Sequence, residues 1–333
     1  MPKLLFPKNG ATVNVYTPLQ EAFLDKIKNI GAEHALQWLL PIKNGQEVSY
    51  PVTISLQWTS DGENTFVVEL SEEQNFYAPY VMHTDKPSRD ISNLKIGQTY
   101  YWRVNGSEPF SFRTSHKGYR FVRIDGLMNV RDLGGIGIRQ GLLYRGSDIE
   151  GEYQITPEGM RAFCKELKIR TELNLRKEHL AISRTGTPEG VQYICLPYRP
   201  YKEVYEEEHR RGICAIMDYL ADENNYPVYF HCLGGADRTG MIAIFLRALV
   251  GETDEDIFTD YELTSLSAYA GGLAEGAAAN GFRSRNSEYF KEFLRLLDAY
   301  GAGESLSVKV PRFLLDCGVT ENTIHKILEI IKV

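Results

Sequence analysis

The residues best suited to chemistry in this sequence are a cysteine and an arginine, Cys232 and Arg238, with five residues between them. Two glycines, Gly234 and Gly235, lie inside this interval, and Thr239 follows it. A thiolate is a strong nucleophile, and a guanidinium can hold two oxygens of a phosphate group at once. Glycines let the backbone turn tightly and approach a bound anion closely. The segment therefore predicts a loop that binds a phosphate group and presents a cysteine nucleophile to it.

A short apolar segment comes before this loop and a longer one follows it. Residues 227–230 are β-prone and uncharged, which predicts a buried strand, whereas the apolar run 241–250 is too long for a strand. Gly251 stands where the C-cap of a helix is expected. A loop between a strand and a helix N-terminus offers backbone N–H groups and partial positive charge to an anion. The predicted phosphate-binding residues are Leu233, Gly234, Gly235, Ala236, Asp237 and Arg238.

Residues beside the loop are expected to support it. His231 directly precedes Cys232, where a neutral imidazole that donates to a nearby carbonyl would shape the loop and tune the thiolate. The Thr239 hydroxyl can donate to the cysteine sulfur. Two other interpretations stay open for the same residues: a buried structural cysteine in a glycine turn, and a module that binds phosphate esters without hydrolysing them.

The composition limits the classes of protein to which the chain can belong. Its 333 residues are 43% hydrophobic and 24% charged, which is typical of a globular protein with about two domains. A net charge of −7 argues against general binding to nucleic acid or to a membrane surface. No apolar run approaches the roughly 20 residues of a membrane span, and residues 1–8 are too short and interrupted for a signal peptide. The location of the protein stays open between the cytoplasm and export with a leader removed.

The other cysteines are scattered, without a C-x-x-C pair or metal-ligand spacing. Cys164, Cys195, Cys214 and Cys317 are therefore interpreted as small buried hydrophobic residues. Neither a metal nor a cofactor is expected.

The chain changes character near residues 115–118. Residues 1–117 contain short alternating segments separated by turns, which predict an all-β sandwich. Within them, residues 19–40 have a helical pattern and are expected to form an insertion or a helix packed on that module. Residues 118–333 alternate between strand and helix patterns, which predicts an α/β domain whose central sheet is flanked by helices.

The run from His231 to Gly240 resembles the Cys-x5-Arg-Ser/Thr signature of the protein tyrosine and dual-specificity phosphatase superfamily. Three further segments resemble elements of a bacterial tyrosine/serine and phosphoinositide phosphatase family, in that family's order: 129–135 (NVRDLGG), 141–147 (GLLYRGS) and 169–176 (IRTELNLR). This resemblance covers roughly residues 120–330. Residues 94–106 are also similar to late strands of fibronectin type III or immunoglobulin-like modules.

The resemblance implies a two-step, metal-free mechanism. Cys232 attacks phosphorus to form a phosphocysteine, while Arg238 and the loop amides stabilise the developing charge. Water then hydrolyses the intermediate. Relatives often carry Gly-Lys-Asp-Arg in this loop, whereas Ala236 replaces the lysine here. The change removes a cation beside the substrate and weakens the case for a highly phosphorylated inositol lipid.

The sequence offers two candidates for the general acid. In tyrosine phosphatases this acid is an Asp on a mobile loop before the nucleophile, but the matching window, 196–203, contains no Asp. Asp237 is the first candidate, because it lies in the loop beside Arg238 and the bacterial relatives share it; orienting a neighbouring backbone group or arginine is its alternative role. Glu203 is the second candidate.

Arginine, carboxylate and tyrosine side chains elsewhere are expected near the site. Arg131 and Asp132 either contribute at the site or form a buried pair that braces the loop. The tyrosines of residues 198–205 either form walls of a pocket or pack on the surface: Tyr198, Tyr201 and Tyr205.

The resulting prediction is a phosphatase for phosphomonoesters, with phosphotyrosine protein or a related small phosphate ester as substrate. A phosphoinositide or inositol-phosphate phosphatase is one alternative, and a non-catalytic phospho-ligand binding protein is another. The expected partner is thus a phosphorylated protein or small phosphate ester and not nucleic acid, and the ligand of the sandwich is left open.

Overall fold

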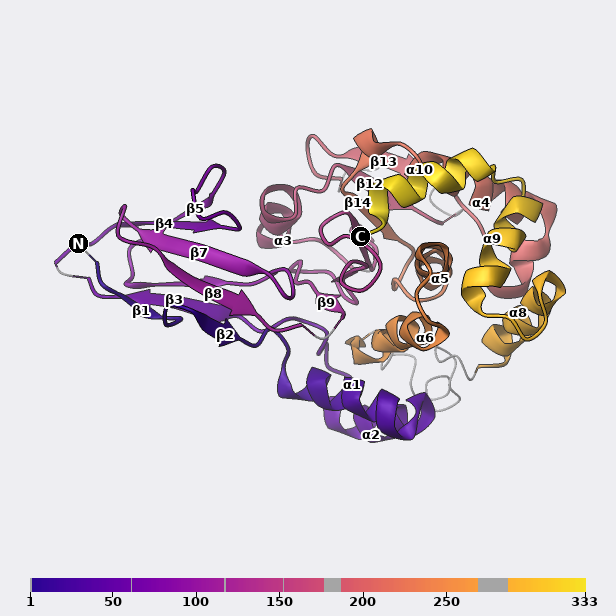
Figure 1. Ribbon diagram of the computed structural model, residues 1–333, viewed down its shortest axis with the longest axis horizontal. Helices are drawn as coiled ribbons and strands as arrows, with labels where there is room; N and C mark the ends of the chain where they lie inside the picture. Colours follow the sequence, from indigo (N-terminus) through magenta and orange to yellow (C-terminus); the bar gives the residue numbers. More distant parts are fainter. Residues whose placement is uncertain (1, 61, 117, 152, 177–186, 269–286) are drawn as a thin grey trace. The chain divides into compact units, whose positions relative to one another are not determined.

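The structure, a computed structural model, describes residues 2–60, 62–116, 118–151, 153–176, 187–268 and 287–333 (Figure 1). The chain forms two compact units. The first comprises Met1–Thr17 and Pro51–Arg120, and the second comprises Pro18–Tyr50 and Phe121–Val333. This division differs from the predicted split into residues 1–117 and 118–333, chiefly because Pro18–Tyr50 groups with the second unit.

The first unit contains two β-sheets. The smaller sheet has the order β1 (Leu4–Phe6), β3 (Ile54–Trp58), β6 (Ser88–Ile91). The larger sheet has the order β2 (Ala11–Val13), β8 (Phe110–Thr114), β7 (Thr99–Val104), β4 (Phe66–Ser71), β5 (Tyr80–Thr84). Trp58 of the smaller sheet packs against Phe66 and Trp102 of the larger one, with ring centroids 5.3 and 6.5 Å apart. The sheets therefore share an aromatic cluster, and the kinship of this unit to fibronectin type III or immunoglobulin-like modules stays a prediction.

The second unit is built on a six-stranded sheet. Its order is β13 (Gln192–Cys195), β12 (Thr171–Asn174), β14 (Val228–His231), β11 (Leu143–Gly146), β10 (Arg131–Asp132), β9 (Arg120–Phe121). The strands β13, β12, β14 and β11 run parallel, and β10 pairs antiparallel with β11. Because β14 lies between two parallel neighbours, the segment that follows it leaves the sheet at the carboxyl ends of the strands, where ligands of open α/β sheets bind.

Both faces of this sheet are buried. Side chains alternate along β14, so this strand contributes residues to a core on each face. Val228 and Phe230 belong to the larger core, and Tyr229 belongs to the smaller one on the opposite face. In the smaller core, Tyr229 packs edge-on against Phe163 at 5.3 Å. The sheet is thus covered on both sides, as the alternation of strands and helices predicted.

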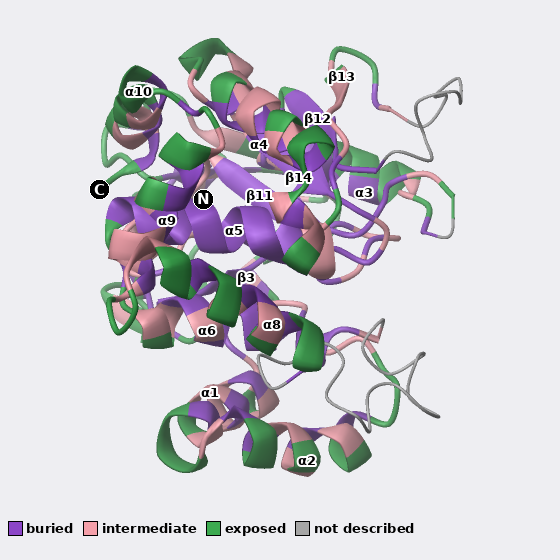
Figure 2. Cartoon of the chain, turned by 90° about the vertical axis from the view of Figure 1, so that its right-hand side faces the viewer, coloured by how far each residue is buried: buried purple, intermediate pink, exposed green. Residues whose placement is uncertain are grey.

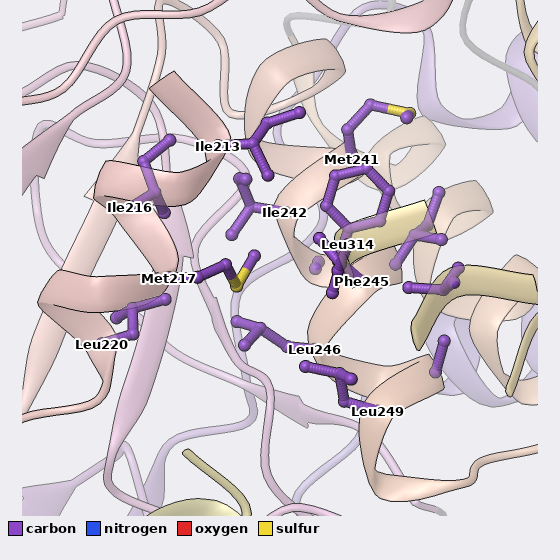
Figure 3. Close-up of a cluster of buried hydrophobic side chains, with 14 of the residues drawn as sticks. Ile213, Ile216, Met217, Leu220, Met241, Ile242, Phe245, Leu246, Leu249 and Leu314 are labelled. Carbon is purple, nitrogen blue, oxygen red and sulfur yellow. The ribbon is translucent and has the colours of Figure 1, made fainter. Parts of the chain in front are cut away.

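The larger core lies under most of the helices of the unit. Figure 3 shows apolar residues of α4 facing those of α5, with Leu314 of α9 beside them. The helices that contribute to this core are α4 (Glu207–Leu220), α5 (Asp237–Val250), α6 (Asp254–Glu262), α8 (Glu288–Leu297), α9 (Leu306–Asp316) and α10 (Glu321–Ile331). The π-helical turn η1 (Ala162–Glu166), which follows α3 (Pro157–Arg161), contributes Phe163 to the smaller core.

Helix α5 is the most deeply buried of these elements, as Figure 2 shows. Every residue from Thr239 to Val250 is buried, so the helix is surrounded on all sides, which explains why this run is apolar apart from Thr239 and Arg247. It ends at Gly251, whose φ of 86° lies in the left-handed region, and the predicted glycine C-cap is confirmed.

The helical pattern near the N-terminus is confirmed by α1 (Pro18–Ile30) and α2 (Ala32–Lys43). At the end of α2, the buried ammonium of Lys43 donates to the carbonyl oxygens of Ser265, at 2.6 Å, and Ser267. Those residues lie at the end of the 3-10 helix η5 (Leu263–Leu266), which continues α6. A buried charged group at the end of α2 therefore joins this helix to the segment after α6 within the second unit. No helix among the described residues is both long and apolar enough to span a membrane.

Candidate active site

The predicted phosphate loop, residues 232–238, occupies the position that the sequence indicated. Strand β14 ends at His231 and helix α5 begins at Asp237, so that the loop connects a central strand to a buried helix. Cys232 is buried, with 5% of its surface exposed. Asp237 and Arg238 at the start of the helix are half-buried. The strand–loop–helix arrangement expected for an anion site is thus confirmed.

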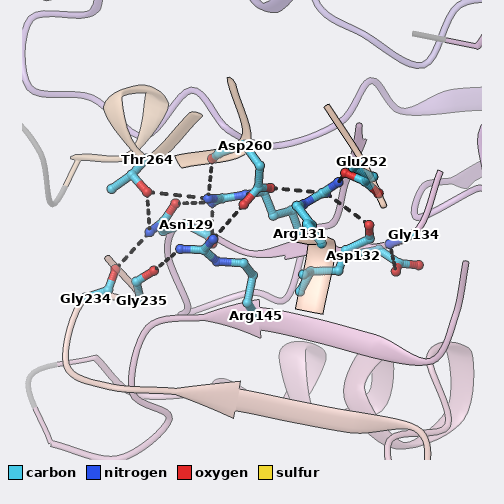
Figure 4. Close-up of polar contacts among 12 residues, drawn as sticks. Asn129, Arg131, Asp132, Gly134, Arg145, Gly234, Gly235, Glu252, Asp260 and Thr264 are labelled. Carbon is cyan, nitrogen blue, oxygen red and sulfur yellow. Dashed lines mark hydrogen bonds and ion pairs between the residues drawn. The ribbon is translucent and has the colours of Figure 1, made fainter. Parts of the chain in front are cut away.

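The carbonyl oxygens of the loop are held by groups behind it. Leu233 O accepts from the Asp148 amide at 2.8 Å, and Gly234 O accepts from Asn129 Nδ2 at 3.0 Å. Gly235 O accepts from Arg145 Nη2 at 2.8 Å (Figure 4). In a planar trans peptide the N–H points opposite to the carbonyl, so the next three amides, at residues 234–236, point away from these donors. Among the described residues these amides have no hydrogen-bond partner, which leaves them for an anion.

Gly235 allows this close packing. Its φ is +66°, and a Cβ built there would lie 2.4 Å from the carbonyl carbon and oxygen of Gly146. The loop therefore passes directly over the end of β11, and a side chain at this position would push the two backbones apart.

A network of buried charges holds the donors in place (Figure 4). Asp260 of α6 pairs through Oδ1 with Arg131 Nε at 2.9 Å and through Oδ2 with Arg145 Nη1 at 2.7 Å. Burial alone would raise the pKa of Asp260, but three guanidiniums, including that of Arg247 at 3.4 Å, outweigh it and lower the pKa. Burial, followed by repulsion from Arg131, lowers the pKa of Arg145 to about 9. Asp260 is thus the shared counter-charge of the residues behind the loop.

The structure separates the roles of Arg131 and Asp132, which the sequence grouped as one pair. Arg131 donates to Asn129 Oδ1 at 2.6 Å and so orients the amide that holds Gly234. The Asp132 carboxylate accepts from the amides of Gly134 and Gly141, at 2.8 and 2.6 Å, and shapes the turn after β10. Consecutive residues of a strand point to opposite faces, which is why one residue joins the network behind the loop and the other shapes a turn.

His231 contacts the carbonyl that the sequence led us to expect. Its Nδ1 lies 2.9 Å from Cys232 O, and its Nε2 lies 3.1 Å from Glu172 Oε1. The ring therefore lies between the carbonyl of the nucleophile and the Glu172 carboxylate, and the neutral form of the imidazole stays a prediction.

Two of the three tyrosines before α4 reach the phosphate loop. Tyr201, the first residue of the 3-10 helix η3 (Tyr201–Tyr205), donates from Oη to Asp237 Oδ1 at 2.5 Å. The Tyr198 hydroxyl donates to the carbonyl of Arg238. Tyr205 instead packs against Phe313 in the core, with ring centroids 5.3 Å apart. Tyr198 and Tyr201 thus contact the phosphate loop, Tyr205 packs in the core, and a role in the walls of a pocket stays a prediction.

The remaining predicted residues have fewer contacts. Glu203 lies in η3, half-buried, and its carboxylate has no hydrogen bond or ion pair within the described part of the chain. The Thr239 hydroxyl is fully buried and has no partner among the described residues, so the expected bond to the cysteine sulfur is not formed in this structure.

Several residues of the site had no role assigned from the sequence. Asp260, Arg145 and Glu172 are all buried and all contact the loop or its supports. The available signal was weak: Glu172 is a charged residue in an otherwise β-prone segment, and Asp260 lies in a helix that begins with an acidic capping pattern.

Comparison with known proteins identifies the family to which the chain belongs. The model of the tyrosine phosphatase family matches residues 122–330. No curated protein matches the chain. Among solved structures, the core catalytic domain of the PP-IP phosphatase SIW14 from S. cerevisiae is 18% identical, over 38% of this chain and 75% of that one, with a TM-score of 0.29. The tyrosine phosphatase OH1 from the Orf virus is 17% identical, over 58% of this chain and 85% of that one, with a TM-score of 0.20.

TM-scores this low carry no argument about this chain. The family model, in contrast, covers most of the second unit, including the phosphate loop and the helices after it. The predicted superfamily is confirmed, and its bacterial branch stays a prediction. The protein belongs to the tyrosine phosphatase family.

Proposed function

We propose that the protein hydrolyses phosphomonoesters through a phosphocysteine at Cys232, with phosphotyrosine protein or a related small phosphate ester as its substrate. The observation that supports this most directly is the set of amides at residues 234–236, which point away from the donors that hold the loop carbonyls. They lie between a buried cysteine and the N-terminus of α5. A phosphate dianion bound there is stabilised by the amides and by the helix dipole.

The reaction proceeds in two steps at phosphorus. The Cys232 thiolate forms an S–P bond while the bond to the leaving oxygen breaks, and Asp237 gives that oxygen a proton. Water then attacks phosphorus, the S–P bond breaks, and the Asp237 carboxylate takes the proton from water. Inorganic phosphate and the thiolate are the products. Arg238 holds two phosphate oxygens, and its planar fork fits their geometry in both steps.

Ala236 favours a substrate with a single phosphate group. It is 2% exposed and occupies the loop position where relatives often carry a lysine. With an apolar methyl there, the loop supplies Arg238 as its guanidinium and no second cation at that position. We therefore place phosphotyrosine before phosphoinositides, whose additional phosphates bind best to additional cations.

Hydrolysis of a phosphotyrosine peptide and of an inositol polyphosphate, each with EDTA present, tests this proposal. We expect faster release of phosphate from the peptide, and a fall of about 10²-fold or more in Arg238→Lys, because lysine keeps the charge but not the fork. Arg211→Lys is the matched control, since Arg211 is 76% exposed on α4. Faster hydrolysis of the inositol phosphate would support the alternative substrate, and binding of vanadate without turnover of either would support a phospho-ligand binding protein.

A further inference from the structure

A chain of three hydroxyl and carboxylate groups ends on Asp237. Tyr201 Oη lies 2.5 Å from Asp237 Oδ1 and 2.6 Å from Tyr261 Oη. Tyr201 and Tyr261 are 7% and 2% exposed. The two tyrosines come from η3 and α6, which are separate elements of the second unit. Hydroxyl groups of two elements therefore meet at the carboxylate of the phosphate loop.

Donor and acceptor capacities give this chain a direction. An ionised carboxylate only accepts hydrogen bonds, so the single proton of Tyr201 Oη is donated to Asp237. Tyr201 Oη then accepts the proton of Tyr261. Burial, followed by the proximity of Tyr261 and Asp237, raises the pKa of Tyr201 well above its usual value, so its hydroxyl stays protonated as a donor. Because Oδ1 accepts from Tyr201, an exchangeable proton of Asp237 is directed to Oδ2.

The backbone at Tyr201 supports a special role. Its φ is +62°, in the left-handed region that aromatic residues seldom adopt. The ring is held by its surroundings, since Tyr289 of α8 lies with its ring centroid 6.2 Å away. Such strain persists only where the surrounding structure fixes it, and it is concentrated at functional sites.

We infer that Tyr201 is a positioning residue for the general acid: its hydroxyl fixes the orientation of the Asp237 carboxyl group toward the leaving group. The inference rests on the proposed function, in which Asp237 protonates the leaving group. Tyr201 and Tyr198 both interact electrostatically with this carboxylate, and Tyr261 contacts Tyr201. The Tyr201 hydroxyl donates directly to Asp237.

Leaving-group dependence separates this role from a structural one. An aryl phosphate with a strongly acidic phenol, such as 4-nitrophenyl phosphate, departs without a proton, whereas phenyl phosphate needs one. Tyr201→Phe removes the hydroxyl and keeps the ring. We expect kcat/KM, which reports phosphoryl transfer to Cys232 and not the later hydrolysis common to both substrates, to fall about 10-fold for phenyl phosphate and to change little for 4-nitrophenyl phosphate.

Tyr205→Phe is the matched control, because it removes another buried hydroxyl of η3 that has no hydrogen-bond partner in the described structure. It should leave kcat/KM for both substrates unchanged. If Tyr201→Phe does not fold, Tyr261→Phe replaces it, since this variant removes the donor to Tyr201 and should give a smaller change in the same direction.

Asp237→Asn distinguishes a failure of the inference from a failure of the proposed function. If Asp237→Asn lowers kcat/KM for phenyl phosphate selectively and the tyrosine variants do not, Tyr201 does not position the acid and the inference is wrong. If Asp237→Asn lowers kcat/KM for both substrates equally, Asp237 is not the general acid, and the proposed proton donor fails together with the inference that rests on it.

Discussion

Arg145 donates from Nη2 to the Gly235 carbonyl at 2.8 Å, so a fully buried cation holds the middle of the phosphate loop from behind. The same guanidinium pairs with Asp260 at 2.7 Å. Helix α6, which carries Asp260 and follows α5 along the chain, thus helps to fix the shape of the phosphate loop that precedes α5. The geometry of the site depends on α6 as much as on the signature residues.

Asp260→Asn should destabilise the second unit strongly. The substitution leaves the buried guanidiniums of Arg131 and Arg145 without their shared counter-charge, and loss of one partner of a buried ion pair costs about 3–5 kcal/mol. Urea unfolding at pH 7, followed by loss of phosphatase activity, measures the change. Asp298→Asn is the control, because Asp298 is 49% exposed in its pair with Lys309 and should cost less than about 1 kcal/mol.

The Asp260 effect should also depend on pH. The folded pKa of Asp260 is held below its ordinary value, so its stabilisation is complete above about pH 4 and disappears as the pH falls through the folded pKa. The difference in unfolding free energy between the wild type and Asp260→Asn should therefore be constant from pH 7 to 5. A difference that vanished already at pH 6 would contradict this account of the network.

Gly235→Ala should abolish phosphate binding. The added Cβ would lie 2.4 Å from backbone atoms of Gly146, and the φ of +66° disfavours any side chain. We expect vanadate affinity and kcat/KM to fall by about 10²-fold or more, because the amides that follow would be displaced. Gly251→Ala is a matched control: its φ is +86°, but a Cβ there has no atom within 4 Å, so it should lose stability and keep activity. Equal activity of the two variants would show that the close approach to Gly146 is unimportant.

Lys43→Met tests the attachment of α2 to η5. Burial is the main cause that lowers the pKa of Lys43, from 10.5 to about 8. Between these values the unfolded chain binds more protons than the folded one, so the wild type gains stability as the pH rises, by up to about 3 kcal/mol. We expect the stability of the wild type relative to Lys43→Met to increase from pH 8 to 10.5. With the exposed Lys28→Met as control, no such increase is expected, and an equal slope in both comparisons would contradict the prediction.

Local patterns in the sequence predicted the elements that carry the site. The uncharged segment before Cys232 and the apolar run that ends at Gly251 gave β14 and α5, because strand and helix periodicity depend on neighbouring residues. The spacing of Cys232 and Arg238 likewise located the loop. The helices within 18–43 were also visible as a pattern, but periodicity does not say against which unit an apolar helix face packs.

Long-range pairings were not predictable in this way. Asp260 is 129 residues from Arg131 and 115 residues from Arg145, and no local pattern joins a helix carboxylate to strand arginines at such separations. The contact between Tyr201 and Asp237, 36 residues apart, depends in the same way on where η3 lies in the fold. The sequence therefore identified the nucleophile loop, and the structure identified the residues that hold it.

The central claim is that Cys232 carries the phosphoryl group during turnover, and trapping that intermediate tests it most directly. The wild type is mixed with 4-nitrophenyl phosphate, quenched in acid within the first turnovers, digested and analysed by mass spectrometry. The account predicts one phosphoryl group on the peptide that contains Cys232, and none on peptides with other cysteines, such as Cys317, whose pKa burial raises to about 12. Cys232→Ser should show no such adduct and should lose activity by about 10³-fold or more. Undiminished turnover by Cys232→Ser, or a phosphoryl group on another residue, would contradict the account.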